Sequence, residues 1–323
     1  MKGLGTLLLI AATSVQLLAP VAGGEPSEPE PAGRDLGQMI QEWRSWFGLR
    51  ESAPEPVRIP LRAAVAQGDF ATVQRLLDQG ADPNGSPDDR DAPLEVAVWY
   101  GHDAIVRLLL ERGADPGRSS GTLNASPLHM AVRRGNEDLA RLLLQHGAPI
   151  DEGVPRVIGV PFDQVGDTPL HQAAAGGNPG LIQLLLEHGA NPVAGNNAGL
   201  TPLHQAAAAG HVEAIVLLME RGAELERASR IGATPLHTAV AEGRVGAAQV
   251  LLERGAQTNT RTRNGTTPLH SAVARHQPEL AALLLEHGAR IESGGLTDET
   301  PLDMARRIGD PELVHLLETA APR

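Results

Sequence analysis

Most of the chain repeats one pattern of apolar and polar positions. A short Ala-rich run follows a Pro-Leu pair, a Gly usually ends it, and a second run then spaces Leu, Ile and Val three or four residues apart. In the segment HVEAIVLLME, at 211–220, this spacing places the apolar residues on one face of a helix. The pattern predicts pairs of short helices, and each pair presents an apolar face that needs a neighbour to cover it.

A tetrapeptide built around Pro-Leu marks the start of each pair. Its forms are IPLR, APLE and SPLH, then four copies of TPLH, and finally TPLD. Their first residues are Ile59, Ala92, Ser126, Thr168, Thr201, Thr234, Thr267 and Thr300. Most steps are 33 residues, and a period in this range indicates stacked helical units that share one core. We therefore predict eight repeats, at 59–91, 92–125, 126–167 with an insertion, 168–200, 201–233, 234–266, 267–299 and 300–323.

The chain resembles an ankyrin-repeat protein, because both the repeat length and the Thr-Pro-Leu-His-x-Ala signature match that family. The resemblance implies an all-α repeat solenoid. Each unit would be a helix-turn-helix with a hairpin-like loop, stacked right to left into an array whose concave face binds a partner. The residue types fit this scheme, since Thr201 is a good N-cap, Pro202 suits the first helical position and Gly210 can adopt the left-handed conformation that ends the helix.

A histidine recurs at the fourth position of the signature in five units. These residues are His129, His171, His204, His237 and His270. If neighbouring helices pack about 8–10 Å apart, successive imidazoles cannot approach one zinc ion at the required ~2.0–2.1 Å. The resemblance implies instead that each His binds the Thr of its own unit and the turn backbone. We assign this structural role to the pairs Thr168 and His171, Thr201 and His204, Thr234 and His237, and Thr267 and His270, and we expect no metal, cofactor or catalytic residue.

Seven aromatic residues occur in the chain, and two of them are adjacent in one repeat. Trp99 and Tyr100 stand at the end of a first helix, where the resemblance implies that side chains face the concave side. Arg133 and Arg134 occupy the same two positions one repeat further on. Because Trp, Tyr and Arg dominate interface hot spots, we predict that these four residues bind a partner. The alternative is that Trp99 packs on the neighbouring hairpin.

The third repeat carries nine extra residues relative to a period of 33. Its segment GVPRVIGVPF, at 153–162, is apolar where a loop tip is usually polar. The side chains of Val157, Ile158 and Phe162 either form a lip that contacts the partner or pack on the protein itself. Sequence reasoning leaves both readings open.

The N-terminal residues 1–24, MKGLGTLLLIAATSVQLLAPVAGG, have the basic start, apolar centre and small-residue end of a secretory signal peptide. An uncleaved membrane anchor is the rival interpretation. Residues 25–58 follow as a Pro/Glu-rich linker, EPSEPEPAG at 25–33, and an amphipathic helix at 34–50. That helix either caps the first repeat or contacts a partner or a membrane surface.

The amino-acid composition indicates in which compartment the protein acts and disfavours some classes of function. Lys2 is the only lysine and Cys is absent, so disulfides and lipid attachment through an N-terminal cysteine are excluded. The wealth of Ala, Gly, Pro and Arg favours a GC-rich, bacterial genome, and export there leads to the periplasm or the exterior. A formal net charge of −12 disfavours nucleic-acid binding and favours a basic or neutral partner.

We find no nucleophile elbow, phosphate loop or metal-ligand cluster in the sequence. We therefore predict a non-catalytic protein–protein interaction module that is exported, monomeric and not inserted in a membrane after signal cleavage. Two alternatives stay open. One is an enzyme with a site in the His-rich turns, and the other is a structural or protective periplasmic factor that binds many proteins.

Overall fold

The computed structural model describes residues 61–85, 92–118, 125–154, 164–292, 294 and 299–320. All of these residues belong to one compact unit, Ile59–Arg323. The predicted signal peptide, linker and N-terminal helix lie outside the described residues.

In the described ranges the regular secondary structure is sixteen helices, arranged as eight pairs. The first helices of the pairs are α3 (Leu61–Gln67), α5 (Pro93–Tyr100), α7 (Pro127–Arg133), α9 (Pro169–Gly176), α11 (Pro202–Ala209), α13 (Pro235–Ala241), α15 (Pro268–Ala274) and α17 (Pro301–Ile308). The second helices are α4 (Phe70–Asp78), α6 (Asp103–Glu111), α8 (Glu137–Gln145), α10 (Pro179–Glu187), α12 (Val212–Glu220), α14 (Val245–Glu253), α16 (Pro278–Glu286) and α18 (Pro311–Ala320).

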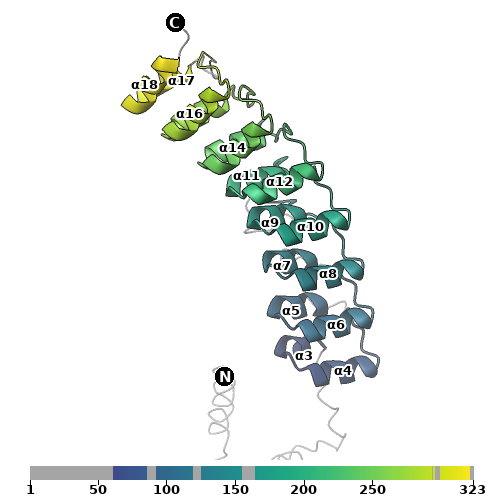
Figure 1. The fold of residues 1–323 in the computed structure, drawn as a ribbon. Helices are drawn as coiled ribbons and strands as arrows, with labels where there is room; N and C mark the ends of the chain where they lie inside the picture. The colour runs from purple at the N-terminus through teal and green to yellow at the C-terminus, as the bar shows by residue number, and fades with distance from the viewer. Residues whose placement is uncertain are drawn as a thin grey trace, which may run out of the picture. The chain divides into compact units, whose positions relative to one another are not determined.

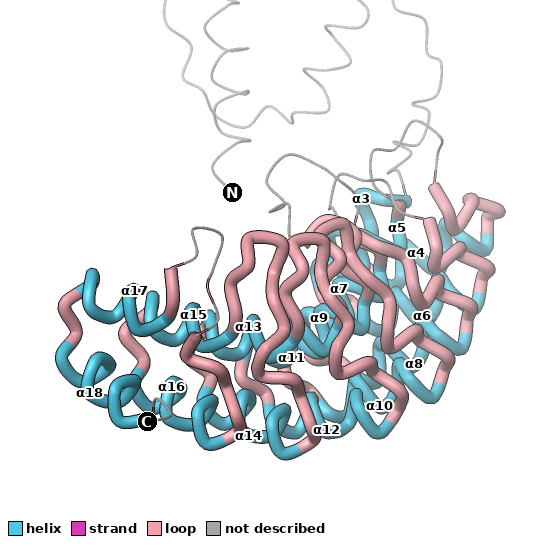
Figure 2. Tube along the Cα trace, turned by 90° about the horizontal axis from the view of Figure 1, so that it is seen from above, coloured by secondary structure: helices cyan, strands magenta, loops and turns pink. Residues whose placement is uncertain are grey.

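The pairs stack in chain order, so each first helix packs on the next first helix and each second helix on the next second helix (Figure 1). The two kinds of helix form two rows, and the loops that join successive pairs extend together on one side of them (Figure 2). The prediction of an all-α repeat solenoid is confirmed.

Capping explains where the first helices begin and end. From α5 to α17 each begins with Pro, preceded by a residue in extended conformation such as Thr201, at φ −99° and ψ 168°. Pro has no N–H to leave unsatisfied at this position. Gly210 ends α11 at φ 85°, and His276 takes the corresponding position after α15 at φ 56°. The imidazole Nδ1 of His276 lies 3.0 Å from Asp310 Oδ2, which ties this unusual turn to the last pair.

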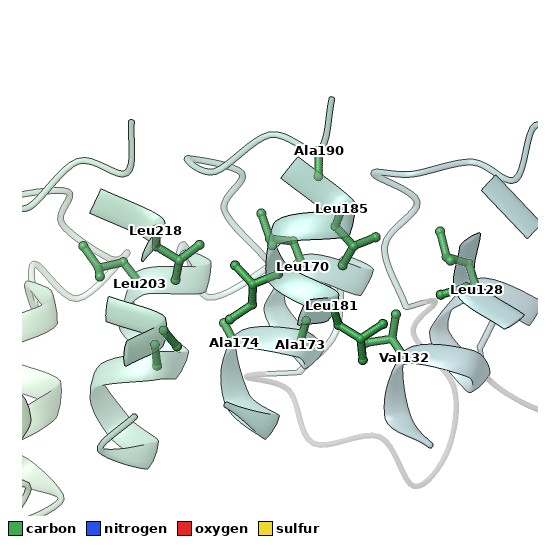
Figure 3. Packing of buried hydrophobic residues seen from close by; sticks show 14 of the residues in the cluster. Leu128, Val132, Leu170, Ala173, Ala174, Leu181, Leu185, Ala190, Leu203 and Leu218 are labelled. Carbon is green, nitrogen blue, oxygen red and sulfur yellow. The ribbon is translucent and has the colours of Figure 1, made fainter. Parts of the chain in front are cut away.

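The buried apolar residues of the described pairs form one continuous cluster. Ala173 and Ala174 of α9 are buried, which allows α9 and its neighbours to approach closely, and Leu170 and Leu203 fill the space between successive pairs (Figure 3). Leu181 and Leu185 of α10, in the second row, belong to the same buried cluster (Figure 3). Truncating one such Leu to Ala would cost about 2–5 kcal/mol of stability.

Successive loops are joined by backbone hydrogen bonds at their tips. We call residues 196–200, 229–233 and 262–266 the fingers. Each finger closes on itself, as Ser229 N–H does on Ala233 O at 2.8 Å. Arg230 N–H donates to Ala198 O at 2.9 Å and Arg263 N–H donates to Ile231 O at 2.8 Å, so each finger holds the next.

Glycines permit this close approach between fingers. Gly199 and Gly232 have φ of 74° and 81°, and a Cβ on either would lie 2.9 or 3.0 Å from the backbone nitrogen of the next finger. The side chains on the fingers are therefore presented at a regular spacing along the array.

Removing residues 300–323 deletes α17 and α18 and exposes the apolar faces of α15 and α16. We expect a lower unfolding temperature or lower solubility, because each repeat is stabilised chiefly by its neighbours. Removing residues 25–33 should change either property little. Thermal unfolding of the two truncations, followed by circular dichroism, checks this, and equal effects would contradict nearest-neighbour stabilisation.

Candidate partner-binding surface

The signature histidines link one repeat to the next. In the fifth repeat the imidazole Nδ1 of His204 lies 2.9 Å from Thr201 Oγ1 and accepts from the Thr201 backbone N–H at 3.1 Å. Since Nδ1 is an acceptor, the proton sits on Nε2, which donates to Ala233 O at 3.0 Å. Ala233 directly precedes the next signature, so one side chain joins its own helix cap to the following repeat.

The same arrangement recurs at the other four histidines. The Nε2 atoms of His171, His237 and His270 donate to a carbonyl 29 residues further on, at 2.9, 3.2 and 3.2 Å. His129 reaches Asp167 O at 2.9 Å, 38 residues away, so the nine-residue insertion leaves this link intact. Glu95 replaces His in the second repeat and accepts from Ala92 N–H at 3.0 Å, and it is fully buried.

Burial keeps these imidazoles neutral. It lowers the pKa of His129, His171 and His204 to about 4, because the imidazolium form would lose its hydration. Burial also lowers the pKa of His237 and His270. The hydrogen bond to the carbonyl raises the pKa in each case but has the smaller effect. Both ring nitrogens of each His are occupied within the scaffold, which leaves neither available to a ligand.

Trp99 and Tyr100, at the end of α5, are exposed by 42% and 58%, although both are large and amphipathic. The guanidinium of Arg133 lies over the indole of Trp99, 5.9 Å from the ring centroid. The ring of Tyr100 stacks on His102, with centroids 5.9 Å apart and an interplanar angle of 19°. We call Trp99, Tyr100, His102 and Arg133 the aromatic patch.

Arg134 has a different position from its neighbour. Its guanidinium donates to the carbonyls of Val98 and Trp99, at the C-terminal end of α5. Val98 O also accepts from Gly101 N–H at 3.2 Å, and a cation is favoured at this end of the helix dipole. Arg134 therefore holds the backbone that carries Trp99, through its Nη1 and Nη2 atoms.

Sequence reasoning missed two further residues that act like Arg134. His211 Nε2 lies 3.0 Å from Ala175 O, and Arg244 Nε donates to Ala208 O at 2.9 Å. Each directly follows the Gly of the first-helix turn and reaches the preceding first helix. That position was the available signal, because it often holds a donor side chain.

The described base of the insertion is closed by hydrogen bonds. Val154 N–H donates to Asp167 O at 2.9 Å, and Gly166 N–H donates to Val154 O at 2.8 Å. Val154 and Val165 are both buried. The predicted partner residues Val157, Ile158 and Phe162 lie outside the described residues.

A family model of ankyrin repeats in three copies matches residues 49–120, 119–196, 152–229, 194–262 and 227–294. The chain belongs to the ankyrin-repeat family. Among curated proteins, none matches it. Ankyrin arrays are scaffolds for protein–protein interaction, so the family points to that class of function.

Within the described ranges of the ankyrin scaffold, no group of three or more His, Asp or Glu side chains is placed to hold a metal ion. None of the described helices is long and apolar enough to cross a membrane.

The lowered histidine pKa values make the array sensitive to acid. Between pH 6.5 and 4 the unfolded chain binds more protons than the folded one, so stability is full above about pH 6.5 and falls as the pH approaches 4. Each of His129, His171 and His204 would contribute up to ~3 kcal/mol to this loss, since one pKa unit corresponds to about 1.4 kcal/mol. Unfolding midpoints measured at several pH values check the slope.

Burial raises the pKa of Glu152 and Glu226, so these two carboxyls raise the stability of the folded state as the pH falls and oppose the histidines. A comparison of the parent chain with His204→Gln therefore isolates the contribution of a histidine. We expect the variant to be less stable than the parent chain at pH 7.5 but to lose less stability on acidification. Equal losses in the two proteins would mean that the buried imidazoles do not govern the acid response.

Proposed function

We propose that this protein is a non-catalytic, exported ankyrin scaffold that holds a partner protein on the face formed by its first helices. The aromatic patch carries this proposal. The fold does not require Trp99 and Tyr100, since the equivalent residues of the fifth repeat are Ala208 and Ala209. An exposed Trp beside Tyr and Arg is the composition of an interface hot spot.

The patch is held in place before a partner arrives. Arg134 binds the backbone of α5, Arg133 covers one face of the indole, and His102 supports the phenol ring. Ordered side chains lose little conformational entropy on binding, so more of the contact energy contributes to affinity. We assign partner contact to Trp99, Tyr100 and Arg133, and a positioning role to Arg134.

The insertion is a second element of the proposed surface. Its apolar residues Val157, Ile158 and Phe162 lie three to eight residues after Val154, and hydrogen bonds at Val154 join the two ends of the insertion. We propose that these residues form a lip for the same partner. Their alternative role, packing on the protein itself, is separated by the insertion variant below.

Export is proposed from the leader sequence of residues 1–24. Fusing this leader to a reporter enzyme that is active only outside the cytoplasm should give activity in the periplasm of a bacterial host. N-terminal sequencing of the exported chain should find the cut near Ala22–Gly24. An intact leader in the membrane fraction would instead support an anchor, and retention in the cytoplasm would refute export.

Replacing the aromatic patch should weaken partner binding without unfolding the array. We expect Trp99→Ala to cost about 2 kcal/mol or more in affinity, the range of hot-spot residues, and Trp99→Ala with Tyr100→Ala to cost more. The partner is first identified by cross-linking and mass spectrometry, and affinities are then measured by calorimetry. Val212→Ala is the matched control, because Val212 is also an exposed apolar residue, at 38%, but lies on a second helix.

A companion variant replaces residues 155–163 with Gly-Ser. An unchanged unfolding temperature with weaker binding supports the lip, whereas an unfolded product favours self-packing. Unchanged affinity in the Trp99 and Tyr100 double variant would move the binding site to the second helices or to the N-terminal helix.

A further inference from the structure

A cavity of about 410 Å³ lies between the fingers and the first helices of the C-terminal half. Its walls are Ala198, Ile231 and Ala233 of two fingers, with Thr238 and Ala241 of α13 and Ser271 of α15. The lining is mainly apolar, and the volume falls within the range of about 300–1,000 Å³ typical of ligand pockets. We call it the Ile231 pocket.

Ala241 lines the pocket at a position where some other repeats carry larger side chains. Ala241 is the seventh residue after its signature threonine, Thr234, and Trp99 is the seventh after Ala92. The same position of the repeat therefore carries a protruding indole in the second repeat and a methyl group in the sixth. Ala208, at the same position in the fifth repeat, does not line the pocket.

Ile231 stands at the rim of the pocket and is 66% exposed, more than any other large apolar side chain in the described ranges. The hydrogen bond from Arg263 N–H to Ile231 O fixes its backbone. Nothing in the finger requires an apolar residue there, since the corresponding residues of the neighbouring fingers are Ala198 and Asn264. An exposed Ile beside an apolar pocket is a contact surface for another apolar group.

The fingers beside the pocket carry positive charge, opposite to that of the whole chain, while one exposed carboxylate, Glu242, follows Ala241. Arg230 lines the pocket, and Arg261 and Arg263 flank Thr262, another lining residue. All three arginines are exposed, and none forms an ion pair with a carboxylate of the described residues. Guanidinium groups bind carboxylates in bidentate fashion, which makes this rim selective for acidic groups.

We propose that the Ile231 pocket anchors an acidic segment of the partner protein, by one apolar side chain in the cavity and flanking carboxylates on Arg230 and Arg263. This inference rests on the proposed function, because it assigns a second contact to the same face of first helices and fingers. It also differs from the expectation from net charge, which favoured a basic or neutral partner. A partner interacts mainly with the charges of the face that it binds, because salt screens charges that lie more than about 10 Å away.

Three fluorescein-labelled peptides test the proposal on the full repeat array. The first has a central Leu flanked on each side by three Glu or Asp residues, the second replaces that Leu with Ser, and the third replaces the acids with Arg and Lys. In anisotropy titrations we expect the acidic Leu peptide to bind at least about tenfold more tightly than either of the others. Its affinity should fall as salt rises, since the flanking contacts are ionic.

Two substitutions locate the binding. Ala241→Leu fills the pocket and should weaken the acidic Leu peptide at least about tenfold, while Ala208→Leu, at the equivalent position outside the pocket, should leave it unchanged. Arg230→Gln should weaken binding and reduce its salt dependence, while Arg227→Gln is the charge-matched control, since Arg227 is paired with Glu224 at 3.5 Å. Unfolding temperatures of all four variants show whether the array is intact.

Equal binding of the three peptides, absence of binding, or equal effects of Ala241→Leu and Ala208→Leu would overturn the proposal. Light scattering of the unliganded protein adds one more outcome. A dimer that Ala241→Leu dissociates would assign the pocket to a second copy of the chain. The aromatic patch gives an independent result, because loss of partner binding in the Trp99 variant with no peptide bound to the pocket would leave the proposed function standing and refute this inference alone.

Discussion

The array depends on one bidirectional hydrogen-bonded side chain, the signature histidine. Its Nδ1 accepts from the cap of its own first helix and its Nε2 donates to the carbonyl that precedes the next repeat, as His204 does between Thr201 and Ala233. The histidine therefore couples the start of its own first helix to the position of the next loop. The insertion shows how strong this constraint is, because His129 keeps its carbonyl partner, Asp167, although nine further residues intervene.

Local rules were sufficient to predict the helices. Thr201, Pro202 and Gly210 act within one turn of chain, so their capping roles follow from residue type and short-range geometry. The partners of His204 required the family resemblance. A carbonyl 29 residues away becomes a neighbour only when repeats stack, and sequence spacing alone does not reveal which carbonyl it is.

The candidate surface was less predictable than the scaffold. Sequence reasoning treated Arg133 and Arg134 alike, yet Arg133 lies over Trp99 while Arg134 binds carbonyls at the end of α5. The two side chains leave adjacent residues in different directions, and only the position of α5 decides which reaches it. The pocket beside Ala241 was missed because an Ala in a first helix indicates close packing, whereas here the fingers and the first helices enclose a cavity beside it.

Stability and recognition use different positions of the same repeat. Packing and capping require Leu203, Ala206 and His204, all of them buried, and these types recur along the array. The seventh residue after the first residue of the signature takes part in neither packing nor capping. It can therefore be Trp99 in one repeat and Ala241 in another without disturbing the hydrogen-bonded links. Charge is distributed in the same manner: the arginines of the fingers stand apart from the acidic second helices, such as Glu213 and Glu220 of α12. The net charge of the chain therefore bears on its solubility, whereas a partner would meet the local charge of the face that it contacts.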